Sequence, residues 1–290
     1  MNPFLRRAAL AALALTLAAC GSDGDLPQDN PFKSSKSERE LRLEAEGLYK
    51  LARRSLDSAD YPGALERYNR IQLRYPFTDY ATQAQLESIY AKYRSFDAEG
   101  AIGTADRFLK EHPRHLSVDY VYYLRGLVNF QRTESFLEEL VDSSAQDVSH
   151  ARRAFDDFAL LTQRYPKSRY AGDARLRMVH LRNRIAAHEL SIVRYYVRRG
   201  AYIAAARRAE SIIADYPGAP ATAEALVVLE GSYRDAGLVA QADEVRKVRE
   251  ANPAVTVPEA APRVERPGGK FGPPPDPIPE PAGAAAQTSP

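Results

Sequence analysis

Small and apolar residues recur at helical spacing through the middle of the chain, from Ser37 to Asn252. A proline disfavours helix in the residue before it, so a regularly spaced proline is expected to end a helix each time. An alanine precedes such a proline by twelve residues in Ala64–Pro76, Ala101–Pro113, Ala154–Pro166 and Ala205–Pro217, and by eleven in Ala242–Pro253. The pattern predicts five repeated units, each with a small residue where two helices approach closely.

The turn inside each unit also repeats. Tyr196, Gly200 and Ala205 recur 37 residues later as Tyr233, Gly237 and Ala242. Glycine accepts the positive φ that a tight turn between paired helices needs. Five units in one register predict an all-α fold, a right-handed α-solenoid of about five tetratricopeptide (TPR)-like helix pairs over residues 37–252.

The units are not evenly spaced, since the prolines lie 37, 53, 51 and 36 residues apart. The first excess falls around 133–147 and predicts an extended loop between two helices. The second excess lies in 167–199, which predicts either one long helix or two in tandem that bend near Ala186-Ala187-His188.

The N-terminus has the pattern of a secretory signal. Arg6 and Arg7 precede a twelve-residue apolar run, 8–19, which is too short to span a bilayer. The run ends in Leu17-Ala18-Ala19-Cys20, which is similar to the lipobox of bacterial lipoproteins, and Cys20 is the sole cysteine in the sequence. We expect residues 1–19 to be a cleaved signal peptide and Cys20 to carry a diacylglycerol and an amide-linked acyl chain such as palmitate, because stable anchoring needs more than one chain. Gly21 favours the outer membrane as the destination.

Two polar or proline-rich segments flank the repeats. Residues 20–36 are predicted to be a flexible tether between the lipid and the solenoid. Eleven of the chain's twenty prolines lie in 253–290, which predicts a disordered or polyproline-like tail. The tail could bind a proline-recognising groove, act as a spacer, or be dispensable.

Composition and motifs give no sign of catalysis. The net charge is +2, so nucleic acid is not an expected partner. The chain lacks a glycine-rich phosphate loop and a nucleophile elbow, and its five histidines have no carboxylate or cysteine partners at metal-ligand spacing. We predict a protein that is not an enzyme and that uses no metal and no cofactor.

Tyrosine is abundant, with seventeen residues, whereas tryptophan is absent. A tyrosine offers rigid apolar area and a polar tip, which suits a groove for an extended peptide. The TPR register places the candidates on the concave side of the first helices, and they are Tyr49, Tyr90, Tyr93, Tyr120 and Tyr123. The alternative for each of them is packing between helices.

Residues 167–208 are basic, with eleven Lys and Arg against Asp173 and Glu189. Such a stretch favours an acidic protein surface or anionic head groups, although it could equally be a solvated helix exterior. The candidates for docking a partner are Arg194, Arg198, Arg207 and Arg208.

Together the lipobox, the tether, the five units and the two widened intervals resemble the BamD (YfiO/ComL) family. The segments that carry the resemblance are 60–64 (DYPGA), 74–77 (RYPF), 119–127 (DYVYYLRGL) and 152–158 (RRAFDDF). The resemblance covers roughly 20–252 and leaves out the tail. It implies a lipoprotein scaffold on the periplasmic face of the outer membrane, within the β-barrel assembly machinery.

The resemblance also implies a division of labour. The N-terminal repeats would contact unfolded outer-membrane protein substrates, and the C-terminal repeats would dock onto the periplasmic domains of a BamA-like barrel subunit, beside other lipoproteins of the machine. Two alternatives stay open. They are a TPR pilotin for secretin or pilus assembly, against which the uneven intervals argue, and a periplasmic TPR partner of the Tol-Pal machinery, against which Cys20 argues.

Overall fold

The computed structural model describes residues 36–133 and 148–252. The predictions made for the signal peptide, Cys20, the tether, the loop within 133–147 and the tail fall almost entirely outside these residues. The chain divides into two units, residues 1–41 and 42–290, and the fold below is that of the second unit and of helix α2, which begins just before it.

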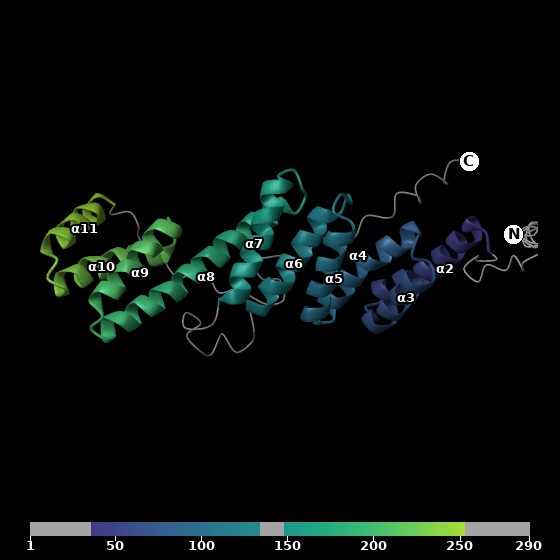
Figure 1. The fold of residues 1–290 in the computed structure, drawn as a ribbon, viewed down its shortest axis with the longest axis horizontal. Helices are drawn as coiled ribbons and strands as arrows, with labels where there is room; N and C mark the ends of the chain where they lie inside the picture. The colour runs from purple at the N-terminus through teal and green to yellow at the C-terminus, as the bar shows by residue number, and fades with distance from the viewer. Residues whose placement is uncertain (1–35, 134–147, 253–290) are drawn as a thin grey trace, which may run out of the picture. The chain divides into compact units, whose positions relative to one another are not determined.

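Within the described ranges the chain forms ten helices and no strand, in five pairs (Figure 1). The first helices of the pairs are α2 (Glu38–Asp57), α4 (Asp79–Arg94), α6 (Val118–Thr133), α8 (Ala171–Arg198) and α10 (Pro220–Asp235). The second helices are α3 (Tyr61–Arg74), α5 (Ala98–Glu111), α7 (Ser149–Arg164), α9 (Tyr202–Asp215) and α11 (Val239–Ala251). The predicted all-α, TPR-like fold is confirmed.

Each second helix ends two residues before one of the repeated prolines. In all five the residue between the helix and the proline leaves the helical region, with φ between −132° and −122°. The five repeated alanines are fully buried, which lets each second helix lie close to its neighbours: Ala64, Ala101, Ala154, Ala205 and Ala242.

The turns inside the pairs have the expected backbone, but the residue that supplies it varies. Gly200 and Gly237 have φ of +71° and +78°, as the repeat predicted. In the first two pairs the same position, five residues before the repeated alanine, holds Ala59 and Phe96, with φ of +60° and +62°. Side chains with a Cβ are strained there, so these two turns are less favourable than the glycine turns.

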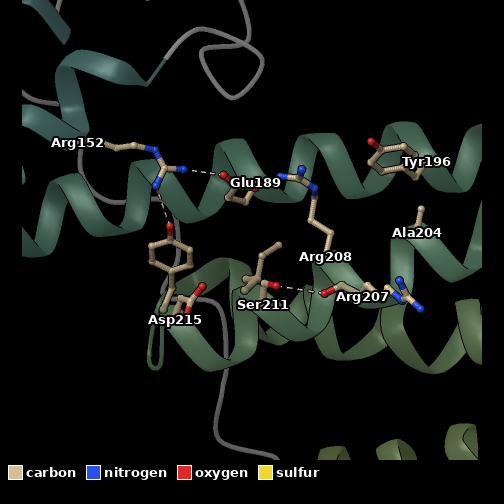
Figure 2. A pocket seen from close by; sticks show the side chains of 10 residues that line it. Arg152, Glu189, Tyr196, Ala204, Arg207, Arg208, Ser211 and Asp215 are labelled. Atoms are coloured by element: carbon tan, nitrogen blue, oxygen red, sulfur yellow. Dashed lines mark hydrogen bonds and ion pairs between the residues drawn. The ribbon is translucent and has the colours of Figure 1, made fainter.

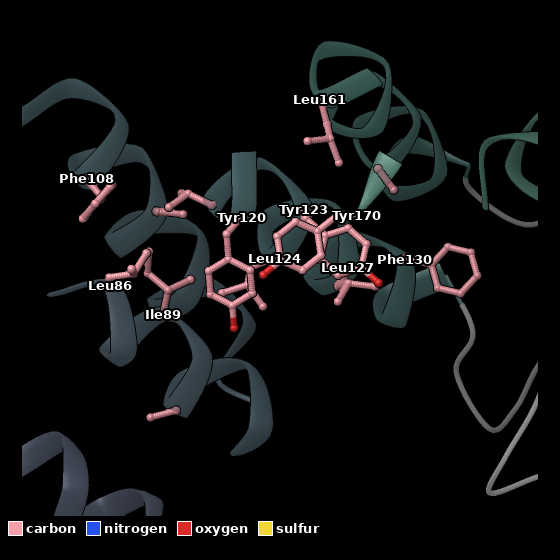
Figure 3. Close-up of a cluster of buried hydrophobic side chains, with 14 of the residues drawn as sticks. Leu86, Ile89, Phe108, Tyr120, Tyr123, Leu124, Leu127, Phe130, Leu161 and Tyr170 are labelled. Atoms are coloured by element: carbon pink, nitrogen blue, oxygen red, sulfur yellow. The ribbon is translucent and has the colours of Figure 1, made fainter. Parts of the chain in front are cut away.

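Helix α8 resolves the widened fourth interval, because 171–198 is one helix of 28 residues. The buried side chains form two clusters that meet along it. One extends from Tyr49 to Ile185 and the other begins at Ala186. Figure 3 shows part of the first cluster, where side chains of α4, α5, α6 and the segment before α8 interdigitate. The extra length of α8 therefore joins two cores with one rigid element.

No helix in the described part of the chain is long and apolar enough to cross a membrane.

Candidate partner-binding surfaces

The basic C-terminal half contains a groove between α7, α8 and α9 with a volume of about 500 Å³. Helix α7 contributes Arg152, α8 contributes Glu189 and Tyr196, and α9 contributes Arg207 and Arg208. Figure 2 shows Arg152, Glu189 and Arg208 coming together where α9 lies beside α8. Two of the four docking candidates, Arg207 and Arg208, thus line one groove, and their role in docking stays a prediction.

Glu189 organises the groove. It accepts a hydrogen bond from Nη2 of Arg152 at 2.6 Å and a second, short one from Arg208. Arg152 also donates through Nη1 to the hydroxyl of Tyr216 at 3.3 Å. One carboxylate thus faces two guanidinium groups, and Arg207 adds a third cation against Asp215. The groove keeps a surplus positive charge and offers tyrosine rings beside it, which suits an acidic side chain next to an apolar one.

The other two docking candidates do not line this groove. Arg194 donates through Nε and Nη2 to both carboxylate oxygens of Glu224, at 2.7 and 2.6 Å, and so ties α8 to α10. Arg198 is exposed in the last turn of α8. Within the described residues neither Arg198 nor Arg207 makes an ion pair, whereas Arg194 and Arg208 hold helices together. The four arginines therefore differ in role.

The tyrosine set is corrected by the structure at three positions. Tyr120 and Tyr123 are buried, because Tyr170, from the segment before α8, covers them (Figure 3). The ring of Tyr170 stacks on that of Tyr123 at 4.8 Å and lies 5.2 Å from that of Tyr120. The hydroxyl of Tyr123 donates to Asp173 at 2.7 Å. The alternative of packing between helices holds for both of these residues.

Tyr49 is also buried, and it belongs to a polar network inside the N-terminal repeats. Its hydroxyl and that of Tyr68 both donate short hydrogen bonds to Glu87, which is fully buried in α4. Arg53 donates to the same carboxylate at 3.1 Å, and Gln83 donates at 3.0 Å. Burial and the adjacent carboxylate raise the pKa of both tyrosines. Tyr49 therefore joins α2 to α4 rather than lining an open groove.

Tyr90 and Tyr93 remain partly exposed on α4 and stay candidates for peptide binding. The guanidinium of Arg94 lies 5.7 Å from the ring centres of both Tyr61 and Tyr90, and its Nη1 donates to the Tyr90 hydroxyl at 2.8 Å. Burial raises the pKa of Tyr93. The guanidinium of Arg94 thus contacts the two aromatic rings of Tyr61 and Tyr90, next to Tyr93.

Sequence reasoning missed Glu87 and the role of Glu189. Glu189 was visible as one of two acids in a basic stretch, which is a weak signal for an organising carboxylate. Glu87 gave no signal, because the tyrosines that bind it lie 38 and 19 residues away along the chain. Only the packing of α2, α3 and α4 brings them together.

Comparisons with known proteins agree with this architecture. Residues 42–248 match the family model YfiO, described as an outer membrane lipoprotein. The chain is 39% identical to a Neisseria meningitidis serogroup A protein named outer membrane protein assembly factor BamD, over 83% of this chain and 88% of that one. It is 36% identical to the Xylella fastidiosa (strain Temecula1) protein of the same name, over 76% of each chain. The Vibrio cholerae protein of that name is 34% identical, over 84% of this chain and 96% of its own. On this evidence the chain belongs to the YfiO family of outer membrane lipoproteins.

Proposed function

We propose that this protein is an assembly factor for outer-membrane proteins and that it acts as a non-catalytic scaffold. The relatives are named outer membrane protein assembly factors, and this chain matches them over most of their length. The observation that carries the proposal is the groove of α7, α8 and α9, in which Arg152, Arg207 and Arg208 outnumber the acids. A helical scaffold with an electropositive groove works by holding a partner, which fits an assembly role.

The partner of this groove is a larger subunit with periplasmic domains, similar to BamA, that presents an acidic surface. The test is the pair Arg198→Glu and Arg207→Glu in a tagged full-length chain. These arginines are chosen because neither makes an ion pair in the described part of the chain, so the Arg194–Glu224 and Arg208–Glu189 pairs stay intact. We expect co-purification of a large barrel subunit from solubilised outer membranes to be lost, while the helical content is unchanged.

A matched control reverses two other exposed arginines, Arg107 and Arg175, on α5 and at the start of α8. It makes the same change in net charge away from the groove and should retain the partner. If no barrel subunit accompanies even the unaltered chain, the assembly role itself is contradicted. If the chain with Arg198→Glu and Arg207→Glu retains the partner, neither Arg207 of the groove nor Arg198 at the end of α8 takes part in docking.

The N-terminal repeats bind unfolded outer-membrane protein precursors at the surface of Tyr90 and Tyr93. Half-buried aromatic rings beside Arg94 offer apolar contact and a cation to an extended chain. A photo-crosslinking residue at position 90 should attach to a synthetic peptide from a barrel strand. The same residue at Tyr195, an exposed tyrosine of α8, is the control and should not. Equal crosslinking at both sites would count against a specific surface.

Lipid on Cys20 holds the scaffold at the inner face of the outer membrane. The lipobox-like Leu17-Ala18-Ala19-Cys20 supports this part of the proposal. Replacing Cys20 with serine should leave the precursor uncleaved or release it from the outer-membrane fraction. A Cys20→Ser chain that is still processed at residue 20 and still sediments with that membrane would refute lipid attachment.

A further inference from the structure

The second helices of the first three pairs all end at one edge of the repeat array. The hydroxyl of Tyr75, just after α3, donates to Glu44 near the start of α2 at 3.1 Å. Gln85 of α4 donates to Glu111 at the end of α5 at 2.9 Å, and Arg164 at the end of α7 donates to Tyr122 of α6 at 3.4 Å. We call residues 73–79, 110–119 and 164–170 the turn edge.

Large apolar side chains protrude from the turn edge with no cover. Phe77 is 101% exposed, Leu116 is 91% exposed and Leu73 is 82% exposed. They lie at or beside the turns that follow the repeated prolines Pro76 and Pro113, and they are not among the side chains that line the groove of α7, α8 and α9. Such side chains would gain free energy if another apolar phase covered them.

The same three segments are rich in exposed cations. The turn edge holds six exposed Lys and Arg, namely Arg74, Lys110, Arg114, Arg164, Lys167 and Arg169. It holds three carboxylates, each already engaged: Asp79 by Arg42 at 3.4 Å, Glu111 by Gln85, and Asp119 by the backbone N–H of Tyr120. Exposed apolar side chains together with Lys and Arg are typical of a protein surface that binds anionic lipid.

At the opposite edge, the turns inside the first two pairs have the reverse charge. Its first two turns, residues 57–61 and 94–99, contain four carboxylates and Arg94 alone as a cation. It also carries an exposed phenylalanine, Phe96, at 78%. The two edges are thus matched in having an exposed aromatic ring but differ in the charge around it.

The chain itself connects the turn edge to the lipid. Arg42, near the start of α2, forms an ion pair at 3.4 Å with Asp79, which belongs to the turn edge. Helix α2 therefore begins at this edge. Cys20 precedes Lys36 by sixteen residues, a segment that can span at most about 55 Å. From these observations we propose that the turn edge lies against the anionic lipid surface into which the acyl chains of Cys20 insert. The inference rests on the proposed lipid attachment and adds an orientation to it.

A single-tryptophan experiment tests this orientation, because the sequence contains no tryptophan. The lipidated full chain carrying Phe77→Trp is placed in vesicles of phosphatidylethanolamine and phosphatidylglycerol. We expect its emission to shift to shorter wavelength and to be quenched by brominated lipid. Phe96→Trp, on the acidic edge, is the matched control and should show neither change. In the Phe77→Trp chain, Arg114→Gln with Lys167→Gln should lower the population in contact roughly tenfold or more, because each cation near an anionic surface favours contact.

Flotation of the same samples distinguishes the lipid attachment of Cys20 from the orientation of the turn edge. If the protein floats with the vesicles while Phe77→Trp behaves like Phe96→Trp, the lipid attachment stands and the orientation is overturned. If the protein does not float, both are overturned, because a contacting edge would add to the attachment. Equal quenching of both tryptophans would also overturn the proposal, since it would mean that no edge is preferred.

Discussion

At the scale of single residues, the clearest strain lies at Phe96 and Ala59. Both have positive φ at the turn where later repeats use Gly200 and Gly237. A left-handed conformation costs a residue with a Cβ roughly 1–2 kcal/mol, and part of this is offset because glycine gains more freedom in the unfolded chain. We predict that Phe96→Gly raises the free energy of unfolding by about 0.5–1 kcal/mol, measured by urea denaturation.

The converse change isolates the backbone contribution. At Gly200 no atom beyond the two neighbouring residues lies within 4 Å of where a Cβ would be, so Gly200→Ala meets no tertiary clash and the φ of +71° is what opposes it. This variant should be destabilised by roughly 1 kcal/mol. A neutral effect at both positions would show that the turns relax freely and that the positive φ stores no strain.

At the scale of helices, the buried carboxylate of Glu87 joins α2, α3 and α4. Four donors point at it, from Tyr49, Tyr68, Arg53 and Gln83. An amide has one acceptor oxygen, so Glu87→Gln leaves donors without an acceptor and leaves Arg53 without its buried counter-charge. We expect a loss of about 3 kcal/mol in the free energy of unfolding, because breaking a buried pair is far more costly than breaking an exposed one.

The control for this change is Glu66→Gln, which removes the pair between Glu66 and Arg70 on the surface of α3. An exposed pair of this kind contributes about 0.5 kcal/mol or less. If both substitutions have the same small effect on the urea midpoint, then Glu87 does not hold the three helices together.

The helices also show which structural features follow from the sequence and which do not. The ends of α3, α5, α7, α9 and α11 follow from the prolines, because an X-Pro bond acts locally. The burial of Tyr120 and Tyr123 could not be predicted in this way. Helical periodicity tells which side of α6 they occupy, but Tyr170, which covers them, arrives from the next repeat. The continuity of α8 likewise does not follow from the sequence, since alanines such as Ala186 and Ala187 suit both a straight helix and a junction.

At the scale of the whole described molecule, tyrosine hydroxyls are held protonated throughout the array. Eight have a raised pKa, namely Tyr49, Tyr68, Tyr80, Tyr93, Tyr120, Tyr123, Tyr170 and Tyr233. Burial is the main cause in seven of them, whereas at Tyr233 a hydrogen bond to Glu210 comes first and raises the pKa to about 12. Seven of them lie between Tyr49 and Tyr170, so their titration reports mainly on the core of the first three pairs.

Their common shift predicts a loss of stability in alkali. An unfolded tyrosine releases its proton near pH 10. Above that pH the folded state binds more protons than the unfolded state, so the free energy of unfolding falls as pH rises toward the folded pKa values.

Each tyrosine that stays protonated at pH 11 contributes about 1.4 kcal/mol to this fall. The melting temperature should therefore drop steeply once the pH rises above about 10, the unfolded tyrosine pKa, and the tyrosinate absorbance of the buried rings should appear together with unfolding. The double variant Tyr49→Phe and Tyr68→Phe removes two of these groups and should lose stability less steeply with pH. An unchanged slope would mean that burial and the adjacent Glu87 do not keep these two hydroxyls protonated.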